Sequence, residues 1–360
     1  MRHLATENRP FSHSPFEAPT HRKTHRESNR WLAMSRATTL YLNARTVQSC
    51  LSDEEVYEIV SQTLREMNTA HVVRGPKSGF GVDIDGDHLH MGSVAGCVLS
   101  SSAAGLKWFV MTGNNRARDL PRALATLVIS DAKTGSLEGV LDATQLTCDR
   151  TAAMGIAAAF ACARRQLRNV AVIGAGHVGR GLVKLLAVTQ PVDRIAVWAR
   201  TESSAQAACE HAAASLPRGL SLFATSDIPS AVRDADVVFT ATAAPEAADL
   251  VHAEWLKQDA IVCTLGSPGD VDIQLISQAW IVVDDPDGVR MRNSRFREGG
   301  AAWGRIAGDL GSLMSGQLRL PECKTRIHLT LAGLGVLDVA LGARALANAR
   351  LKSLGVPLEK

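Results

Sequence analysis

One segment constrains the fold of this chain more than any other: a Val/Ile-rich run passes through a glycine turn into an apolar stretch with helical spacing. The run covers residues 168–173, and the turn places Gly174, Gly176 and Gly179 in a G-x-G-x-x-G pattern. A second apolar run, residues 194–198, follows where a βαβ unit returns. In such units the first glycine permits a tight turn, the second lets the backbone approach a pyrophosphate, and the third allows close helix packing. The segment therefore predicts a dinucleotide site at a helix N-terminus.

The end of the second apolar run indicates which dinucleotide binds. Sites for NAD usually carry Asp or Glu there to hold the ribose 2′-hydroxyl, whereas sites for NADP lack this acid and offer Arg. This chain has Ala199, Arg200 and Thr201 at that position, and an Arg guanidinium suits a 2′-phosphate. NADP(H) is therefore the favoured cofactor. NAD(H) stays an alternative, because some NAD sites use only backbone contacts at this place.

Strand-like and helix-like segments alternate after the glycine turn. Short apolar runs fall at residues 221–224, 235–242, 260–266 and 280–283, each bounded by helical or turn-rich stretches. This alternation is typical of a doubly wound parallel sheet of the Rossmann type.

A different organisation is expected before residue 150. Residues 52–67 predict a helix with Ser52 as its N-cap and Glu55 as the capping-box partner, and several β-rich segments follow. A small-residue helix over residues 329–346 is expected to cross back to this part of the chain. The predicted fold class is α/β: a Rossmann sheet plus an α+β substrate and dimerisation domain that the C-terminal helix completes.

Composition excludes several classes of function. With 360 residues, 46% of them hydrophobic, the chain can bury a large core, and its formal net charge of +3 is too small to predict nucleic-acid binding. Residues 1–33 are rich in His, Arg and Pro without apolar periodicity, so we expect a disordered extension and an alternative start at Met34. No apolar run approaches the roughly 20 residues that span a bilayer. We expect a cytoplasmic protein without membrane segments.

The cysteines and histidines predict neither disulfides nor a metal site. Seven cysteines form no C-x-x-C pair, and an odd number is typical of reduced thiols. His88 and His90 alternate along one expected strand, but no third ligand accompanies them. Cys148 has no His at a spacing that would activate it, so packing is its expected role.

Three cations are candidates for holding an acidic substrate against a nicotinamide ring. Lys107 stands in an apolar, strand-like run, and Lys77 lies in a Gly/Pro/Ser turn. Arg150 lies between the Thr-containing run 141–147 and an alanine-rich helix that starts at Thr151, which predicts a position at a helix mouth. A single cation of this kind is more often a solvated surface charge. That alternative explains Lys107, inside an apolar strand, and Arg150, before an alanine-rich helix, less well than Lys77.

An ordered series of motifs resembles the ornithine cyclodeaminase/μ-crystallin family. The motifs are Gly105-Leu-Lys-Trp-Phe109, Asn115, the run 120–135, Leu146-Thr-Cys-Asp-Arg-Thr-Ala-Ala153, the glycine turn, and the closing segment 303–342 with Gly333-Leu-Gly-Val-Leu-Asp338. The resemblance covers about residues 40–350. It implies a homodimer with a substrate and dimerisation domain at residues 34–151, completed by residues 303–360, and a Rossmann domain at residues 152–302.

The resemblance also implies roles for individual residues. In the family, the residues matching Lys107 and Arg150 bind the substrate α-carboxylate, and we expect Lys77 and Met91 beside them. Lys107 is also the candidate catalytic residue, because a buried Lys shifts its pKa readily and can polarise an imine or relay a proton. No metal is expected. The expected cofactor residues are Gly174, Gly176, His177, Val178, Gly179, Ala199, Arg200, Thr201, Thr242, Leu265 and Gly266.

Two departures from the family argue against cyclodeaminase chemistry. Cyclodeaminases carry an Asp in a Gly-x-Asp-x-Pro-Gly loop, where this chain has Pro268, with Asp270 and Asp272 as candidate substitutes if the loop shifts. They also carry a Glu two residues before a Met-Pro pair, where this chain has Leu89. The chain instead resembles the branch that dehydrogenates N-(2-amino-2-carboxyethyl)-glutamate, in the turn Gly75-Pro-Lys77, the run Leu120-Pro-Arg-Ala123 and the pair Lys107-Trp108.

The leading hypothesis is an NAD(P)-dependent oxidoreductase that acts on the C–N bond of an amino acid or N-substituted amino acid. Hydride would pass between an α-carbon and the nicotinamide, in the manner of an imine reductase or opine-type dehydrogenase. The alternatives are an ornithine cyclodeaminase, which is an ammonia-lyase, and a non-catalytic NADP-binding protein like μ-crystallin. The reaction direction and the substrate side chain stay open.

Overall fold

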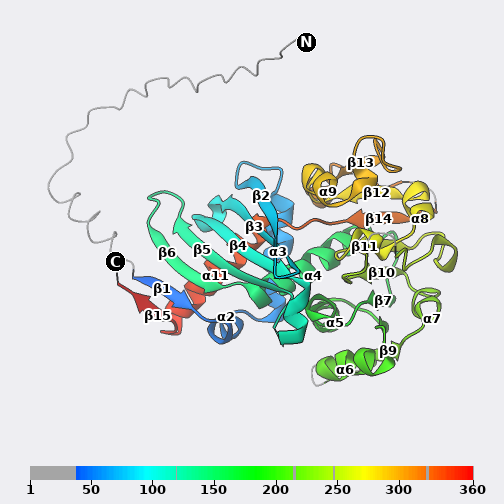
Figure 1. Cartoon of the computed structure of the whole chain (residues 1–360), viewed down its shortest axis with the longest axis horizontal. Coiled ribbons are helices and arrows are strands. Elements are labelled where there is room, and N and C mark those ends of the chain that lie inside the picture. Colours follow the sequence, from blue (N-terminus) through cyan, green and yellow to red (C-terminus); the bar gives the residue numbers. More distant parts are fainter. Residues whose placement is uncertain (1–37, 119, 214–215, 246–247, 322–323, 360) are drawn as a thin grey trace, which may run out of the picture. The chain divides into compact units, whose positions relative to one another are not determined.

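The structure is a computed structural model that describes residues 38–118, 120–213, 216–245, 248–321 and 324–359. The expected extension at residues 1–33 and the alternative start at Met34 lie outside these residues. Two β-sheets form the framework of the described chain, and helices pack against both of them (Figure 1).

The first sheet is mostly antiparallel and has the strand order β15–β1–β6–β5–β4–β3–β2, with β1 and β6 as a parallel pair. Its outermost neighbours β1 and β15 come from opposite ends of the described chain. The strands are β1 (Thr39–Leu42), β2 (Val72–Ile84), β3 (Asp87–Val98), β4 (Ala103–Thr112), β5 (Ala123–Asp131), β6 (Leu137–Asp142) and β15 (Val356–Leu358).

Lys77 lies inside a strand, so the predicted turn at this position is wrong. The pairing of β2 with β3 shifts between Arg74 and Lys77. The residues between them are Gly75 and Pro76, and Pro has no backbone N–H to donate to the ladder. The Gly/Pro pair therefore produces an irregularity within one long strand, and the strand continues past it.

The second sheet is parallel throughout and confirms the predicted doubly wound Rossmann sheet. Its strand order is β13–β12–β14–β11–β10–β7–β8–β9. The order reverses at β7, where the chain first builds outward through β8 and β9 and then returns to β10 on the other side. The strands are β7 (Asn169–Ile173), β8 (Arg194–Trp198), β9 (Ser221–Thr225), β10 (Val237–Thr240), β11 (Ile261–Thr264), β12 (Trp280–Val283), β13 (Ile306–Asp309) and β14 (Ile327–Thr330).

Two strands of this sheet follow residue 302, where the sequence analysis ended the Rossmann domain. β13 extends one edge, and β14 inserts between β11 and β12. The predicted helix over residues 329–346 is therefore wrong at its start, because residues 327–330 form β14 and the helix begins at Gly335. A four-residue apolar run of this kind does not distinguish a strand from the first turn of a helix.

Helices cover both faces of the second sheet, and its side chains alternate between two apolar cores. In β7, Val170 and Val172 face the core shared with α4 and α5, whereas Ala171 and Ile173 face the core shared with α7 and α8. The helices are α2 (Ala44–Cys50), α3 (Asp53–Glu66), α4 (Thr144–Ala161), α5 (His177–Thr189), α6 (Glu202–Ala213), α7 (Ile228–Val232), α8 (Ile273–Gln278), α9 (Pro286–Arg292), α10 (Leu310–Met314) and α11 (Gly335–Leu351).

α4 and α11 connect the two sheets. α4 is buried almost all round and contacts β5 of the first sheet and β11 of the second, as expected of a helix that is apolar on every side. α11 packs on β3 and β4, so the predicted return of the C-terminal helix is confirmed. The predicted capping box of α3 is present as well: Ser52 accepts from the backbone N–H of Glu55, whose carboxylate accepts from the backbone of Ser52.

No helix within the described ranges has the length and apolar character needed to cross a bilayer. The same residues contain no group of three or more His, Cys, Asp or Glu side chains arranged to hold a metal ion.

Candidate active site

The glycine turn lies between β7 and α5, and its three glycines have different surroundings. Gly174 has a φ of +123°, which favours glycine. A Cβ on Gly179 would lie 1.8 Å from the carbonyl oxygen of Gly174, so α5 approaches β7 too closely for a side chain. A Cβ on Gly176 would meet no atom within 4 Å. This open space beside the first turn of α5, which starts with His177 and Val178, fits a pyrophosphate.

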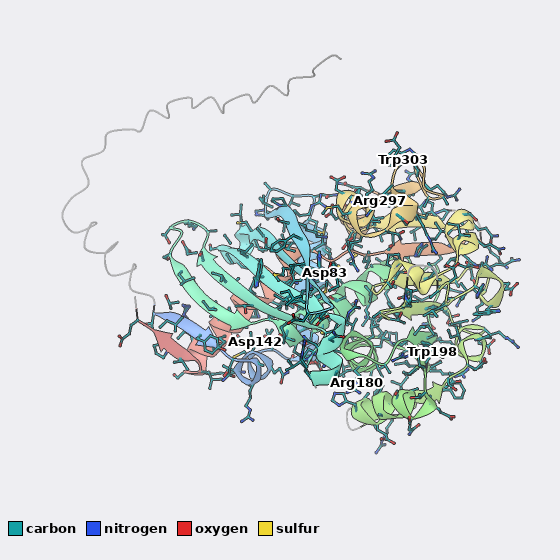
Figure 2. All side chains as sticks on the ribbon, viewed as in Figure 1. Asp83, Asp142, Arg180, Trp198, Arg297 and Trp303 are labelled. Atoms are coloured by element: carbon teal, nitrogen blue, oxygen red, sulfur yellow. The ribbon has the colours of Figure 1, made fainter. Side chains whose placement is uncertain are left out.

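The residues expected to distinguish NADP from NAD follow β8. Trp198 ends this strand (Figure 2). Its indole N–H donates to the carbonyl of Ser226 at 2.9 Å. Arg200 is exposed just beyond it. The hydroxyl of Thr201 accepts from the backbone N–H of Ser204 at 3.3 Å and lies 2.8 Å from the Ser204 hydroxyl. The chain therefore places Arg200 just before the Thr201 and Ser204 hydroxyls, which lie at the N-terminus of α6, where an anion is favoured.

Thr242, Leu265 and Gly266 lie just after β10 and β11, at the carboxyl edge where open α/β sheets bind ligands. Both the hydroxyl and the backbone N–H of Thr242 donate to the carboxylate of Asp270. This carboxylate is fully buried and also accepts from the backbone N–H of Ser267, and burial raises its pKa. Asp270 therefore links the segment after β10 to the segment after β11 by hydrogen bonds.

Lys77 and Lys107 lie on one face of the first sheet. Val94 of β3 pairs with Lys77 of β2 on one side and with Lys107 of β4 on the other, so the three residues form one cross-strand row. A Cβ on Gly335 of α11 would lie 2.6 Å from Val94, which shows that this face is the one α11 covers. Met91 pairs with Val110 and points to the opposite face, because side chains alternate along a strand. The structure brings the two lysines together and separates Met91 from them.

Arg150 lies inside α4, so the predicted position at a helix mouth is wrong. β6 ends at Asp142 and α4 begins at Thr144, where the Asp142 carboxylate accepts from the Thr144 backbone N–H. Thr147 and Arg150 are three residues apart, and both contact Asp338 of α11 from the same side of α4. The two threonines resemble strand residues in the sequence, which hid the true start of the helix.

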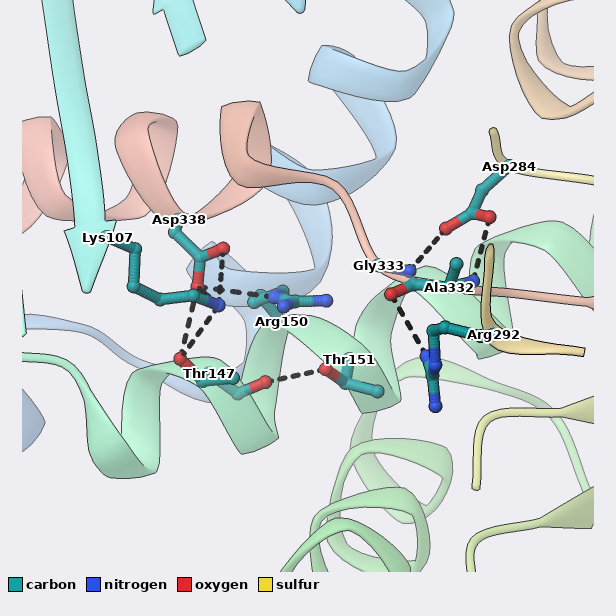
Figure 3. A network of polar contacts seen from close by, with 9 residues as sticks. All are labelled: Lys107, Thr147, Arg150, Thr151, Asp284, Arg292, Ala332, Gly333 and Asp338. Carbon is teal, nitrogen blue, oxygen red and sulfur yellow. Dashed lines mark hydrogen bonds and ion pairs between the residues drawn. The ribbon is translucent and has the colours of Figure 1, made fainter. Parts of the chain in front are cut away.

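A buried carboxylate joins the two predicted substrate cations (Figure 3). Asp338 has no exposed surface, and its oxygens lie 3.0 and 2.9 Å from Nζ of Lys107. Nε of Arg150 donates to Oδ1 of Asp338 at 3.2 Å. The hydroxyl of Thr147 lies 3.2 Å from the same oxygen and 3.3 Å from Nζ of Lys107. The Asp338 carboxylate of α11 thus binds one cation from β4 and one from α4.

Burial and neighbouring charge act on the Lys107 ammonium. Only 3% of the Lys107 surface is exposed, and burial together with the nearby Arg150 guanidinium lowers its pKa to about 8, against the attraction of Asp338. Burial also raises the pKa of the adjacent Cys148 thiol to about 12, which makes a thiolate nucleophile unfavourable there. The pKa of Lys107 is thus lowered toward neutral pH, whereas the neighbouring thiol stays protonated there.

The guanidinium of Arg150 faces the carboxyl edge of the second sheet. A Cβ on Gly333, just after β14, would lie 2.7 Å from its Nη1. Arg292 of α9 donates to the carbonyls of Ala332 and Gly266, each at 3.1 Å. The path from Arg150 through Gly333 and Arg292 ends at Gly266, which adjoins Thr242. Arg150 and the predicted cofactor residues Gly266 and Thr242 therefore lie near the same edge of the second sheet.

A second group of charges lies between β2 and the end of β12. Nζ of Lys77 has no hydrogen-bond partner and lies 3.5 Å from the carboxylate of Asp285. Burial lowers its pKa, against the attraction of Asp284 and Asp285. Asp284 accepts from the backbone N–H groups of Ala332 and Gly333, which fixes the turn beside Arg150.

Sequence reasoning missed Asp338, Asp284 and Arg292 as site residues. In the sequence, Asp338 stands out only as part of the closing motif. It is nevertheless the one acid in the apolar residues 335–342, and such a lone acid indicates a buried ion pair. Asp270 and Asp272 are the two candidate substitutes for the loop carboxylate. Asp272 caps α8 by accepting from the backbone N–H of Leu275 at 2.8 Å, and Asp270 is buried and bonded to Thr242 and Ser267.

A cleft of about 420 Å³ lies beside α5. Among the predicted site residues of the described chain, His177 alone lines it. Its apolar floor comes from α2, α3, α4 and α11, and its basic rim includes Arg180 and Lys184 of α5. This cleft does not contain the Lys107–Asp338–Arg150 group.

Comparison with protein families places the chain. The model of the ornithine cyclodeaminase/mu-crystallin family matches residues 38–347. The chain belongs to this family.

Individual relatives agree with this assignment. The chain is 30% identical over 212 residues to the Delta(1)-pyrroline-2-carboxylate reductase of Paracoccus denitrificans, a match that covers 54% of this chain and 64% of that protein. It is 22% identical over 340 residues to the N-((2S)-2-amino-2-carboxyethyl)-L-glutamate dehydrogenase of Staphylococcus aureus, covering 89% of this chain and 98% of the relative. The fold is similar to that of the Thermococcus litoralis Delta(1)-pyrroline-2-carboxylate reductase in complex with NADH and L-proline, with a TM-score of 0.79, 21% identity, and coverage of 89% and 100%.

Proposed function

We propose that this family member is an NADP(H)-linked oxidoreductase that reduces a carboxylate-bearing imine to the corresponding amino acid, or catalyses the reverse reaction. The observation that carries the proposal is the placement of the Arg150 guanidinium beside the carboxyl edge of the Rossmann sheet, where Gly266 and Thr242 adjoin the glycine turn. The two relatives named above are, by their names, a reductase and a dehydrogenase that act on C–N bonds, and this chain is an oxidoreductase of the same kind.

The side chains divide the work of binding. Arg150 offers a planar pair of N–H groups that match a carboxylate, and Lys107 adds a buried positive charge behind it. When bound, the nicotinamide supplies or accepts the hydride. Binding the α-carboxylate at Arg150 would hold the adjacent C=N carbon at the carboxyl edge of the second sheet, beside the residues that would hold the dinucleotide. The ammonium of Lys107 adds positive charge beside the same carboxylate, and it can supply the proton that the imine nitrogen gains when the carbon gains hydride.

The cofactor preference that we propose is NADP(H) over NAD(H). Support comes from Arg200 and from the hydroxyls of Thr201 and Ser204 at the N-terminus of α6. The open space at Gly176 supports a pyrophosphate at the N-terminus of α5. The relatives do not decide this preference, because the Thermococcus litoralis reductase is in complex with NADH.

Cyclodeamination is disfavoured by the positions of the acids. Pro268 takes the place of the family's loop Asp, and Leu89 replaces the Glu before the Met-Pro pair. Asp270, the nearest substitute, is fully buried and already accepts from Thr242 and Ser267. A substrate amine would have to displace these partners to reach it.

We also propose that the protein is a homodimer that pairs through the uncovered face of its first sheet. Phe80, Met91, Val110 and Leu124 form a cross-strand row on the face opposite α11, and Trp108 shares that face. Phe80, Trp108 and Leu124 are 57%, 43% and 41% exposed, which is unusual for large apolar side chains grouped on one sheet. A second copy would bury this face, and this is where the predicted substrate residue Met91 lies.

The decisive experiment follows NADPH absorbance during incubation with Δ1-pyrroline-2-carboxylate, and with mixtures of 2-oxo acids and amino acids that form imines. We expect NADPH oxidation with at least one imine, and formation of the secondary amine in equal amount. Binding of NADPH without turnover of any imine would favour the non-catalytic alternative. Proline and ammonia formation from ornithine, without net change in the nicotinamide, would show that the protein is a cyclodeaminase.

A further inference from the structure

Asp338 is the meeting point of three elements that are far apart in the sequence. Its carboxylate, on α11, accepts from Lys107 of β4 and from Arg150 and Thr147 of α4, at 2.9 to 3.2 Å. The side chains of Lys107, Arg150 and Asp338 are 3%, 8% and 0% exposed, so water screens this group poorly. Each of the two cations has the other as a buried neighbour, and the carboxylate lies between them.

The charge of the group matches one carboxylate ligand. Two cations and one anion leave a single positive charge, whereas the same pair without Asp338 would place two positive charges together in a buried region. Burying like charges without a counter-ion shifts one of them to its neutral form, and for this pair the titrating member is Lys107. Asp338 therefore permits both cations to stay charged before the ligand arrives.

The geometry also fixes which edge of the guanidinium is available. Asp338 accepts from Nε of Arg150, while Nη1 points to the Gly333 turn at the carboxyl edge of the second sheet (Figure 3). If Asp338 bound both Nη groups, the ligand edge of Arg150 would be occupied. Contact through Nε leaves the outer amino groups for a bidentate carboxylate.

We propose that Asp338 is a positioning residue that orients Arg150 and keeps Lys107 protonated, so that the three side chains together present one net positive charge to the substrate carboxylate. This inference rests on the proposed function for its ligand, but its charge effect on Lys107 does not depend on turnover. Charged and titratable groups that face Lys107 are Arg150 and Cys148 of α4 and Asp338 of α11.

The test replaces Asp338 with Asn, which keeps the size of the side chain and removes its charge, and compares Asp131→Asn in the β5–β6 turn as a matched control. For Asp338→Asn we expect NADPH affinity within about twofold of the unaltered protein. KM for the imine, or the dissociation constant for L-proline measured by calorimetry, should rise at least tenfold. The basic limb of kcat/KM, near pH 8 in the unaltered protein, should move at least one pH unit lower. Asp131→Asn should change none of these.

A second measurement separates the inference from the proposed function. In protein with ¹³C-labelled lysine, the titration of the Lys107 ammonium by NMR should fall by at least one pH unit in Asp338→Asn, whether or not any imine is reduced. A purely structural role for Asp338 would lower the unfolding midpoint and leave that titration and the ligand affinity unchanged, which would overturn the proposal. If Asp338→Asn does not fold, Thr147→Val removes the hydroxyl that contacts both Asp338 and Lys107 and must weaken carboxylate binding about threefold. Unchanged binding in that variant would equally overturn it.

Discussion

Two glycines of the same turn are expected to fail in opposite ways when they gain a side chain. In Gly176→Val the new Cβ enters open space, and the backbone at φ −75° and ψ −171° is one that Val adopts readily. The folded protein therefore loses only the preference for Gly over Val at an N-cap, up to about 1 kcal/mol. The same side chain occupies the space where we place the pyrophosphate. Loss of even two charge-assisted hydrogen bonds, about 1.5–3 kcal/mol each, weakens NADPH binding by more than about 100-fold.

Gly179→Ala is the matched comparison, and it acts on stability first. The added methyl would lie 1.8 Å from the carbonyl oxygen of Gly174, so α5 must move away from β7 by more than 1 Å, on the order of the missing van der Waals distance. Overpacking costs about 1–3 kcal/mol, and a contact this short with a backbone oxygen belongs at the upper end of that range. The better helix propensity of Ala offsets about 1 kcal/mol, which leaves a net loss of about 2 kcal/mol. The smaller substitution should therefore be the more destabilising one.

Both variants are compared by urea unfolding without cofactor and by NADPH fluorescence titration. We expect Gly176→Val to unfold near the urea midpoint of the unaltered protein and to bind NADPH at least 100-fold more weakly, as worked out above from the lost phosphate contacts. We expect Gly179→Ala to unfold at a clearly lower urea concentration. Undiminished cofactor affinity in Gly176→Val would refute the assignment of this turn to the pyrophosphate. A Gly179→Ala protein as stable as the unaltered one would refute the packing argument.

Three further outcomes are expected. Arg200→Ala should weaken NADPH by about 10- to 100-fold and NADH by less than about twofold, since the lost contact is charge-assisted and specific to the 2′-phosphate; equal effects on both cofactors, measured by titration, would contradict this. Arg150→Ala should raise KM for the imine at least about tenfold while NADPH affinity stays near its original value, because only the substrate loses its bidentate partner; steady-state kinetics with each substrate varied in turn measure both. His328 is buried against Thr264, and burial lowers its pKa to about 4. Because the unfolded chain protonates this His from about pH 6.5 downward and the folded chain only near pH 4, the free energy of unfolding should fall by up to about 3 kcal/mol between these pH values. Urea unfolding at pH 7 and pH 4.5 measures this slope, and it should flatten in His328→Gln.

Local patterns in the sequence were sufficient to predict several strands of the Rossmann sheet and the start of α3. β8 spans the predicted residues 194–198, and Ser52 and Glu55 form the predicted capping box. These features depend on neighbours within one turn or one strand, where periodicity and capping chemistry are decisive. The same holds for the glycine turn, whose three positions have the separate surroundings that the pattern implies.

Long-range pairing was beyond the reach of the sequence. The position of β14 between β11 and β12 depends on strands more than 40 residues away, and residues 327–330 carry no local mark of it. Arg150 was placed at a helix mouth because two threonines before it suggested a strand. Asp338 became a site residue only when α11 was packed on β4, which brought it to Lys107, 231 residues earlier.

The arrangement of the first sheet has a consequence for biosynthesis. β1, the first described strand, pairs with β15 at residues 356–358 and lies in a sheet that α11 covers at residues 335–351. The ribosome must therefore synthesise the chain through residue 358 before this sheet has both α11 and its edge strand β15. Until then the apolar face of β3 and β4 that α11 will cover stays uncovered, and contacts of such high sequence separation form slowly. Nascent chains stalled before residue 335 should consequently depend on chaperones.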